Sequence, residues 1–212
     1  MADIVVKVLE PATSFSFVTL DEVKTFLGLT TSDTEDEQLQ FMIDIASATI
    51  MRVCNRMFAR EKVQESWREV GNGRLYLTHW PVEEDDIESV TTGGSTAPLD
   101  PTTYELEEDS GKLATYNGGW NAPPTVVIYT GGYDLPDDAP LPLKQACLLM
   151  VRDSKLAAAR LSITGIRSLS HKDSRVQFFD YTKPPPAVAG GAKMTGDPAV
   201  DAILYHYIKI WV

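Results

Sequence analysis

The chain has 212 residues, of which 43% are hydrophobic and 23% are charged, as in a globular protein of one domain with at most an appendage. It has neither the long apolar stretch of a membrane-spanning helix nor the basic and then apolar start of a secretory signal, so we expect a cytosolic protein without membrane contact. The formal net charge of −11 argues against tight binding of nucleic-acid phosphates, although residues 165–212 are slightly basic.

The first quarter of the chain predicts a β-like run followed by two helices. Residues 4–9, IVVKVL, have the apolar, β-branched character of a strand. Thr19 and Glu22 match a capping box, which predicts a short helix over residues 19–28 that ends at a glycine. Residues 34–58 carry apolar side chains at alternating steps of four and three, with an acidic first turn and a basic last turn, and this pattern predicts a long helix.

The middle of the chain changes from a helical to an alternating pattern. Residues 62–130 predict about five short strands separated by Gly, Pro and Asp turns. Gly71-Asn72-Gly73 lies between two alternating runs and predicts a β-hairpin that joins them. The helical period returns over residues 142–161.

These elements predict an α+β fold with a helical core of one short and two long helices and an inserted β-rich region in residues 1–181. A C-terminal extension that ends in a helix follows this domain. The two long helices should pack through their apolar sides. The core residues expected from this packing are Leu39, Ile43, Ala46, Ile50, Val53, Leu143, Cys147 and Met150.

The C-terminal extension has two parts. Residues 182–198 contain a triple proline and paired glycines, which is the composition of a linker. Residues 199–212 predict a helix with much apolar surface, which must be covered because a short helix is marginal alone in water. The helix either folds back on its own core or reaches away and inserts into another protein, and the long linker favours the second arrangement.

Motifs for catalysis, cofactor binding or metal binding are not apparent. His79, His171 and His206 lack metal-ligand spacing and are expected at the surface or at an interface. The acidic run at residues 83–88 lacks the glycine-centred spacing of a calcium loop, so a solvated loop is the simpler interpretation. Both cysteines fall on apolar helix stripes, where buried thiols are expected.

The order of several segments over roughly residues 18–160 resembles one protein family. These segments are VTLDEVKTFLGL, DTEDEQLQFMIDIASATIMRVCNR, VQESW, LYLTHWPVEEDDIESV, YELEEDSGKL, GWNAPPTVVIYTGGYDLP and PLKQACLLMV. In this order the chain resembles the head-tail connector, or head-completion adaptor, proteins of tailed bacteriophages and gene transfer agents. Residues 162–198 depart from the family pattern.

The resemblance implies a structural protein of the virion neck, assembled in the host cytoplasm, that forms a ring of about twelve copies under the portal. Its partners would be the portal and a stopper or tail-completion protein, and genomic DNA would pass through the ring without specific binding. The acidic character suits such a channel, or it serves only to keep the subunit soluble before assembly. By the same resemblance the C-terminal helix would bind the portal through Ile203, Leu204, Tyr207, Ile208, Ile210 and Trp211.

Two other functions remain open. The first is that of another neck or tail component, such as a stopper or tail-completion protein. A small hydrolase without a recognisable motif is the alternative from a different class, and it would not change its oligomeric state when portal is added.

Overall fold

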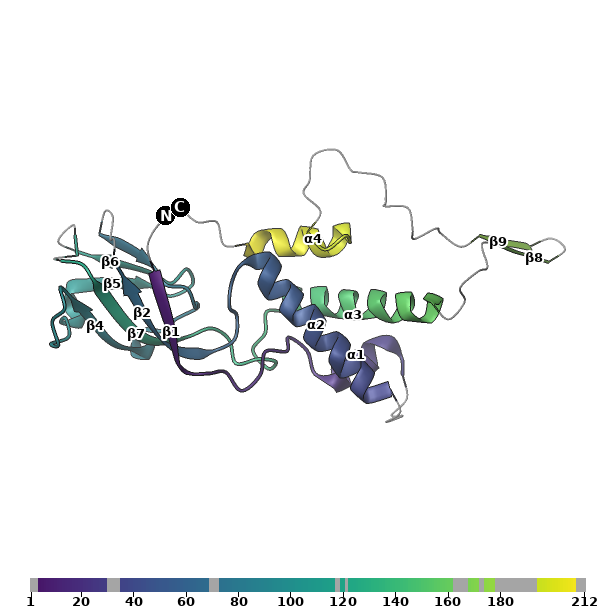
Figure 1. Ribbon diagram of the computed structural model, residues 1–212, viewed down its shortest axis with the longest axis horizontal. Helices are drawn as coiled ribbons and strands as arrows, with labels where there is room; N and C mark the ends of the chain where they lie inside the picture. The colour runs from purple at the N-terminus through teal and green to yellow at the C-terminus, as the bar shows by residue number, and fades with distance from the viewer. Residues whose placement is uncertain are drawn as a thin grey trace.

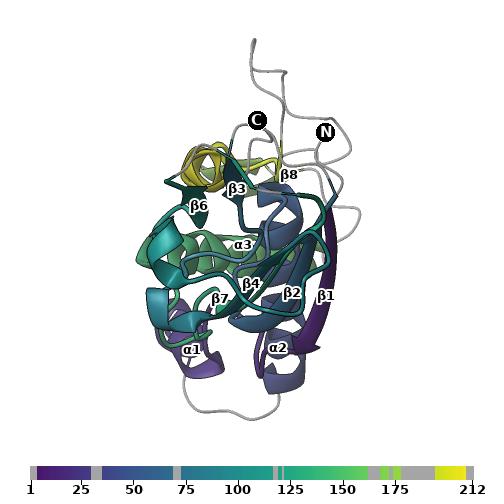
Figure 2. The same cartoon turned by 90° about the vertical axis from the view of Figure 1, so that its left-hand side faces the viewer.

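The computed structural model describes residues 4–29, 35–68, 73–116, 119–120, 122–161, 168–171, 174–177 and 194–208. The fold is α+β, as the sequence predicts, with two β-sheets at one end of the molecule and the helices at the other (Figure 1). Seen from the sheet end, the strands lie in front of the helices (Figure 2).

Three helices form the body of the helical end: α1 (Leu20–Leu27), α2 (Asp36–Cys54) and α3 (Leu141–Leu161). Thr19 and Glu22 make the expected capping box at the start of α1, and Gly28 ends that helix in a left-handed conformation. The second helix ends at Cys54 and not near residue 58, because Asn55 adopts a left-handed conformation that turns the chain toward the sheets.

Four antiparallel strands form the larger sheet, in the order β1-β2-β7-β4. They are β1 (Ile4–Glu10), β2 (Glu61–Trp67), β7 (Thr125–Gly131) and β4 (Ile87–Thr92), which begins after the 3₁₀ turn η2 (Glu84–Asp86). The N-terminal run therefore joins the β-rich region as the edge strand of this sheet.

The smaller sheet has three strands, β3 (Arg74–Tyr76), β6 (Lys112–Thr115) and β5 (Tyr104–Glu107), with the 3₁₀ turn η3 (Pro101–Thr103) before β5. The predicted hairpin between β2 and β3 is wrong, because β2 pairs with β1 and β7 whereas β3 pairs with β6. The local turn signal marks where β2 ends. It does not determine the pairing, because the partners of β2 and β3 lie far from them along the chain.

A tight crossing links the sheets to the helices, where β7 passes the segment that leaves α2. The Tyr133 amide donates to the Phe58 carbonyl at 2.7 Å, and the Arg60 amide donates to the Tyr133 carbonyl at 2.9 Å. Gly132 has φ +109°, and a Cβ there would collide with the Ala59 carbonyl oxygen. A Cβ on Gly131 would collide with the His79 carbonyl oxygen. These two positions therefore require glycine, and the crossing fixes how the chain returns from the sheets to α3.

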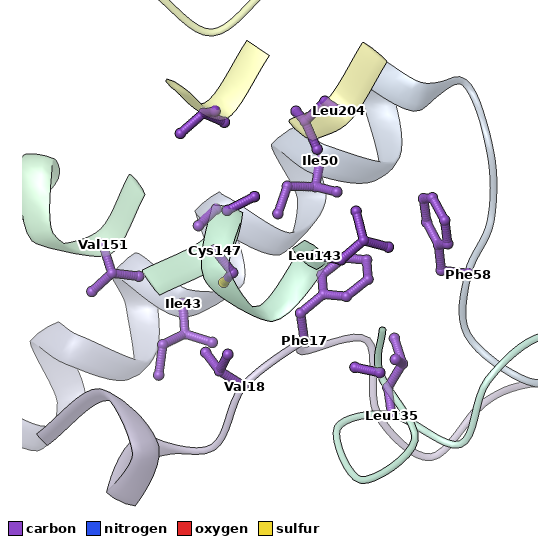
Figure 3. Packing of buried hydrophobic residues seen from close by; sticks show 14 of the residues in the cluster. Phe17, Val18, Ile43, Ile50, Phe58, Leu135, Leu143, Cys147, Val151 and Leu204 are labelled. Carbon is purple, nitrogen blue, oxygen red and sulfur yellow. The ribbon is translucent and has the colours of Figure 1, made fainter. Parts of the chain in front are cut away.

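The helices enclose an apolar cluster (Figure 3). Within it, Phe17 and Phe58 meet edge to face, with ring centroids 5.5 Å apart. The fully or nearly fully buried members labelled in the figure are Phe17, Val18, Ile43, Ile50, Phe58, Leu135, Leu143, Cys147, Val151 and Leu204.

A second apolar cluster lies among the strands, and it contains buried polar groups. Glu65 is fully buried on the same strand face as Val63, and its Oε1 accepts hydrogen bonds from the Thr78 amide at 2.8 Å, the Thr78 hydroxyl and the Tyr129 hydroxyl. Burial is the main cause of a raised pKa at Tyr129, so its hydroxyl stays protonated and donates at neutral pH. This network connects three separate segments of the β-rich region.

The C-terminal quarter contains a hairpin and a short helix. β8 (Ser168–His171) pairs with β9 (Ser174–Gln177) in a separate two-stranded sheet. The last helix, α4 (Pro198–Leu204), is followed by the 3₁₀ turn η4 (Tyr205–Tyr207) and is shorter than the predicted helix over 199–212. The linker expected at 182–198 lies mostly outside the described residues.

Candidate assembly surfaces

The described residues present no arrangement typical of a catalytic or metal centre. In this part of the chain no group of three or more His, Cys, Asp or Glu side chains is placed to hold a metal ion. Burial raises the pKa of the Cys54 thiol to about 11 and that of the Cys147 thiol to about 12, so both thiols are protonated and unreactive at neutral pH. None of the described helices is long and apolar enough to cross a bilayer.

The expectation that His79 lies at the surface is wrong. Its side chain is buried, with Nε2 3.2 Å from Glu61 Oε2 and Nδ1 2.8 Å from the Thr78 hydroxyl. The local sequence gives no sign of this, because Glu61 comes from a strand 18 residues earlier. The alternation of residues 61, 63, 65 and 67 does carry a signal, since it places both carboxylates of β2 on the buried face.

Arg56 connects the two ends of the molecule. The guanidinium lies over the Trp80 ring and 4.5 Å from the Phe58 ring centroid, and Nη2 donates to the Trp80 carbonyl oxygen. Burial lowers the pKa of Arg56 to about 10, so the side chain remains charged at neutral pH and is held mainly by aromatic rings. The sequence suggested only that this arginine complements the end of α2, so its role between helices and sheets was missed.

The predicted core residues lie between α2 and α3. Val53 and Met150 are half-buried at the edge of the cluster, and the other six are buried within it. Ser47, which was not predicted, is also buried and lies 3.8 Å from the Cys147 sulfur, and it accepts a hydrogen bond from the Phe17 amide.

The C-terminal helix packs back on this core, which differs from the expected arrangement in which it reaches away. Val200 and Leu204 are fully buried, and the Tyr207 ring meets Phe58 edge to face at 6.2 Å. The physical reason is that two apolar side chains one turn apart fill the space above α2 and α3. Among the other predicted portal-binding residues, Ile203 and Ile208 are half-buried, and Ile210 and Trp211 lie outside the described residues.

Apolar side chains are exposed along β1. The exposed fractions are 46% for Val5, 40% for Val6, 45% for Val8 and 37% for Leu9. Val5 also lines an open hollow of about 500 Å³ together with Ser66, Arg68, Pro123 and Pro124. A sheet edge with this much apolar surface is typical of a site that another chain covers.

A second group of exposed apolar side chains lies on the helices. Phe41 is 65% exposed and Ile45, one turn later on α2, is 48% exposed. Phe26 on α1 is also exposed. Large apolar side chains in these positions add nothing to the subunit's own core, so they are candidates for contacts with a partner.

Comparisons with known proteins agree with this picture of an assembly subunit. A family model described as "Head completion protein" matches residues 16–153. No curated protein sequence matches the chain.

Three solved structures share the fold across nearly the whole chain. A chain of the "Neck of empty GTA particle computed with C6 symmetry" matches with a TM-score of 0.61 and 16% identity, covering 98% of this chain and 97% of that one. A chain of the "Virion of native gene transfer agent (GTA) particle" matches with a TM-score of 0.55 and 15% identity over 98% and 96%. A chain of the "Neck of native GTA particle computed with C12 symmetry" matches with a TM-score of 0.55 and 14% identity over 98% and 97%. Because the family match covers more than half of the chain, from before α1 through the β-rich region into α3, the chain belongs to the head completion protein family.

Proposed function

We propose that this protein is a non-enzymatic adaptor of a phage-like particle. It forms a ring under the portal in the virion neck, lines the channel through which DNA passes and provides the platform for a stopper or tail-completion protein. Assembly takes place in the host cytoplasm. The observation that carries the proposal is the family match over residues 16–153, together with a fold shared with chains of gene transfer agent neck structures.

The exposed apolar surfaces support a ring. Repeated head-to-tail contacts around an axis need two different contact faces on each copy. The structure has apolar surface on β1 at the sheet end and on α1 and α2 at the helical end. The C6 and C12 symmetries used for the neck structures suit such a ring, and we propose about twelve copies.

The charge of the chain supports passage of DNA without specific binding. A net charge of −11 leaves few cationic groups free to release counterions from phosphates. Several of the described basic side chains are also paired with carboxylates, including Lys24 with Asp36 at 2.7 Å and Arg60 with Asp86 at 2.7 Å. These pairs reduce the attraction to DNA further.

The C-terminal segment, residues 199–212, remains the proposed portal attachment, but α4 does not reach away from its own core as first expected. Leu204 is fully buried in the subunit's own core and does not face a partner. Tyr205 is 70% exposed on the outer side of this segment, and Ile208, Ile210 and Trp211 follow it in the chain. Portal would therefore contact the outer side of the segment while α4 stays on its own core.

The test is co-sedimentation of the full-length protein with portal from the same particle. Trp211→Ala and Tyr205→Ala should each weaken attachment at least tenfold, because aromatic anchors dominate contacts of this kind. Tyr116→Ala is the matched control, since Tyr116 is 64% exposed directly after β6, a strand at the sheet end of the molecule. Unchanged attachment of both aromatic variants would contradict the role of the segment. Failure of the unmodified protein to attach would contradict the adaptor function.

A further inference from the structure

Two of the strand edges among the described residues lie at opposite ends of the molecule (Figure 1). One is the outer edge of β1 in the four-stranded sheet, and the other belongs to the β8–β9 hairpin, whose strands pair only with each other among the described strands. An isolated two-stranded hairpin is marginally stable in water, so a further strand or another packing surface would stabilise this one.

The outer edge of β1 has the regular geometry that strand addition requires. Ile4 to Val8 pair with β2 in unbroken register, and the irregularity begins only after Val8. This regular stretch contains no proline and one charged residue, so it lacks most of the features that blunt an edge strand. Within the described residues, no backbone hydrogen bond outside the β1–β2 ladder involves the stretch.

The opposite edge of the same sheet is partly covered by the chain itself. At β4 the Leu99 amide donates to the Val90 carbonyl at 2.7 Å, and the register shifts between Ile87 and Ser89. The edges of the smaller sheet belong to β3 and β5, which have three and four residues. β1, with seven residues, is therefore the longer and less obstructed edge.

The hairpin cannot reach β1 of its own chain. It begins at Ser168, seven Cα steps beyond the end of α3 at Leu161, and seven extended steps span at most about 25 Å. The 21 residues of α3 make a helix of about 30 Å, and β1 lies beyond the start of that helix (Figure 1). A β8–β9 hairpin that adds to β1 must therefore belong to another molecule.

We propose that the β8–β9 hairpin of one copy adds to the β1 edge of the next copy, so that successive subunits of the ring are joined by strand addition. This inference rests on the proposed ring and names the contact that closes it. The strands of the hairpin have four residues each, which fits the five-residue regular stretch of β1. The slightly basic residues 165–212 would meet the acidic body of the neighbour, which favours this contact over like-charged ones.

The direct test is photo-crosslinking of the full-length protein with p-benzoylphenylalanine in place of Val5. Nitrogen-15-labelled and unlabelled chains are mixed and irradiated where light scattering shows an oligomer, with portal added if assembly requires it. Mass spectrometry should find labelled-to-unlabelled links from position 5 to residues 168–177. The same probe at Tyr116, which is exposed directly after β6 of the other sheet, is the control and should not form them.

Complementary variants test the direction of the contact. One variant replaces residues 168–177 by a Gly-Ser linker, and the other is Val8→Lys, which places a second charge on the edge. Each alone should lose the ring while keeping the melting temperature of the unmodified chain, and a one-to-one mixture should form dimers and nothing larger. If Val8→Lys lowers the melting temperature, Val5→Lys replaces it.

The outcomes separate this inference from the proposed function. An oligomer without links from position 5 to the hairpin, or a ring that forms without residues 168–177, would overturn the strand-addition contact and leave the adaptor function standing. If the unmodified chain formed no oligomer, with or without portal, both the strand-addition contact and the adaptor function would be contradicted.

Discussion

The helical core and the β1 edge use apolar side chains in opposite ways. In the core, side chains from segments far apart in the sequence bury one another almost fully, and even the C-terminal helix contributes two of them. Along β1, four apolar side chains stay between one third and one half exposed although the strand is fully paired on its inner side. The difference teaches that side chains covered within one subunit stabilise its fold, whereas exposed apolar side chains are where we propose that subunits meet.

The largest effect is expected for Ile43→Asp. Ile43 is fully buried between α2 and α3, and an unpaired carboxylate there should cost roughly 4 kcal/mol or more of unfolding free energy. The protein should unfold or aggregate, as size-exclusion chromatography and thermal melts would show. Ile45→Asp is the matched control on the same helix, because Ile45 is 48% exposed and should tolerate the change. A variant at Ile43 that is as heat-stable as its control would contradict the packing of α2 on α3.

A smaller effect is expected for Leu204→Ala, which tests whether α4 belongs to the core. Loss of this buried side chain should cost about 2–5 kcal/mol of unfolding free energy. Tyr205→Ala, one residue later and 70% exposed, should change stability by less than about 0.5 kcal/mol. Urea denaturation measures both variants. Equal midpoints for the two would mean that α4 detaches from the core in solution, as the linker composition first suggested.

Gly132→Ala tests the crossing between sheets and helices. A Cβ at this position would meet the Ala59 carbonyl oxygen, and the φ of +109° is strained for any residue except glycine. We expect a loss of about 1–3 kcal/mol of unfolding free energy. Gly119→Ala is the control, because a Cβ there would meet no heavy atom within 4 Å beyond its chain neighbours and its φ lies outside the left-handed region. Equal melting temperatures for the two variants would contradict the requirement for glycine at position 132.

The weakest effect concerns DNA. Mobility-shift assays with duplex DNA at physiological salt should detect no binding at micromolar protein, and any residual binding should fall steeply as salt rises. Lys62, which is paired with Glu88 at 2.8 Å, is an example of a cation already neutralised within the subunit. Submicromolar binding would contradict a channel through which DNA slides, and it would point to the slightly basic C-terminal quarter as the place to look.

Much of the fold could be predicted from local patterns. Helix α1 follows from its capping box, and α2 and α3 follow from apolar side chains at helical spacing, because these signals lie within a few residues of one another. Strands β4 to β7 follow from alternation in the same way. The order of these segments then indicated the family, which the family match confirms.

What could not be predicted depends on partners distant in sequence. The buried position of His79 depends on its contacts with Glu61 and Thr78. Contrary to the turn signal, β2 does not pair with β3, because β1 and β7 lie on its two sides. The place of α4 was misjudged for a related reason. A Pro/Gly-rich linker sets how far a segment can travel, but the fit of Val200 and Leu204 above α2 and α3 decides where it stays.

The central claim is that this head completion protein assembles as a ring on portal. Cryo-electron microscopy of the full-length protein mixed with portal from the same particle tests it most directly. We expect one ring of about twelve copies beneath each portal, with α4 on its own helical core and an added strand beside each β1. Portal particles without additional density, alongside a protein that remains monomeric, would contradict the account.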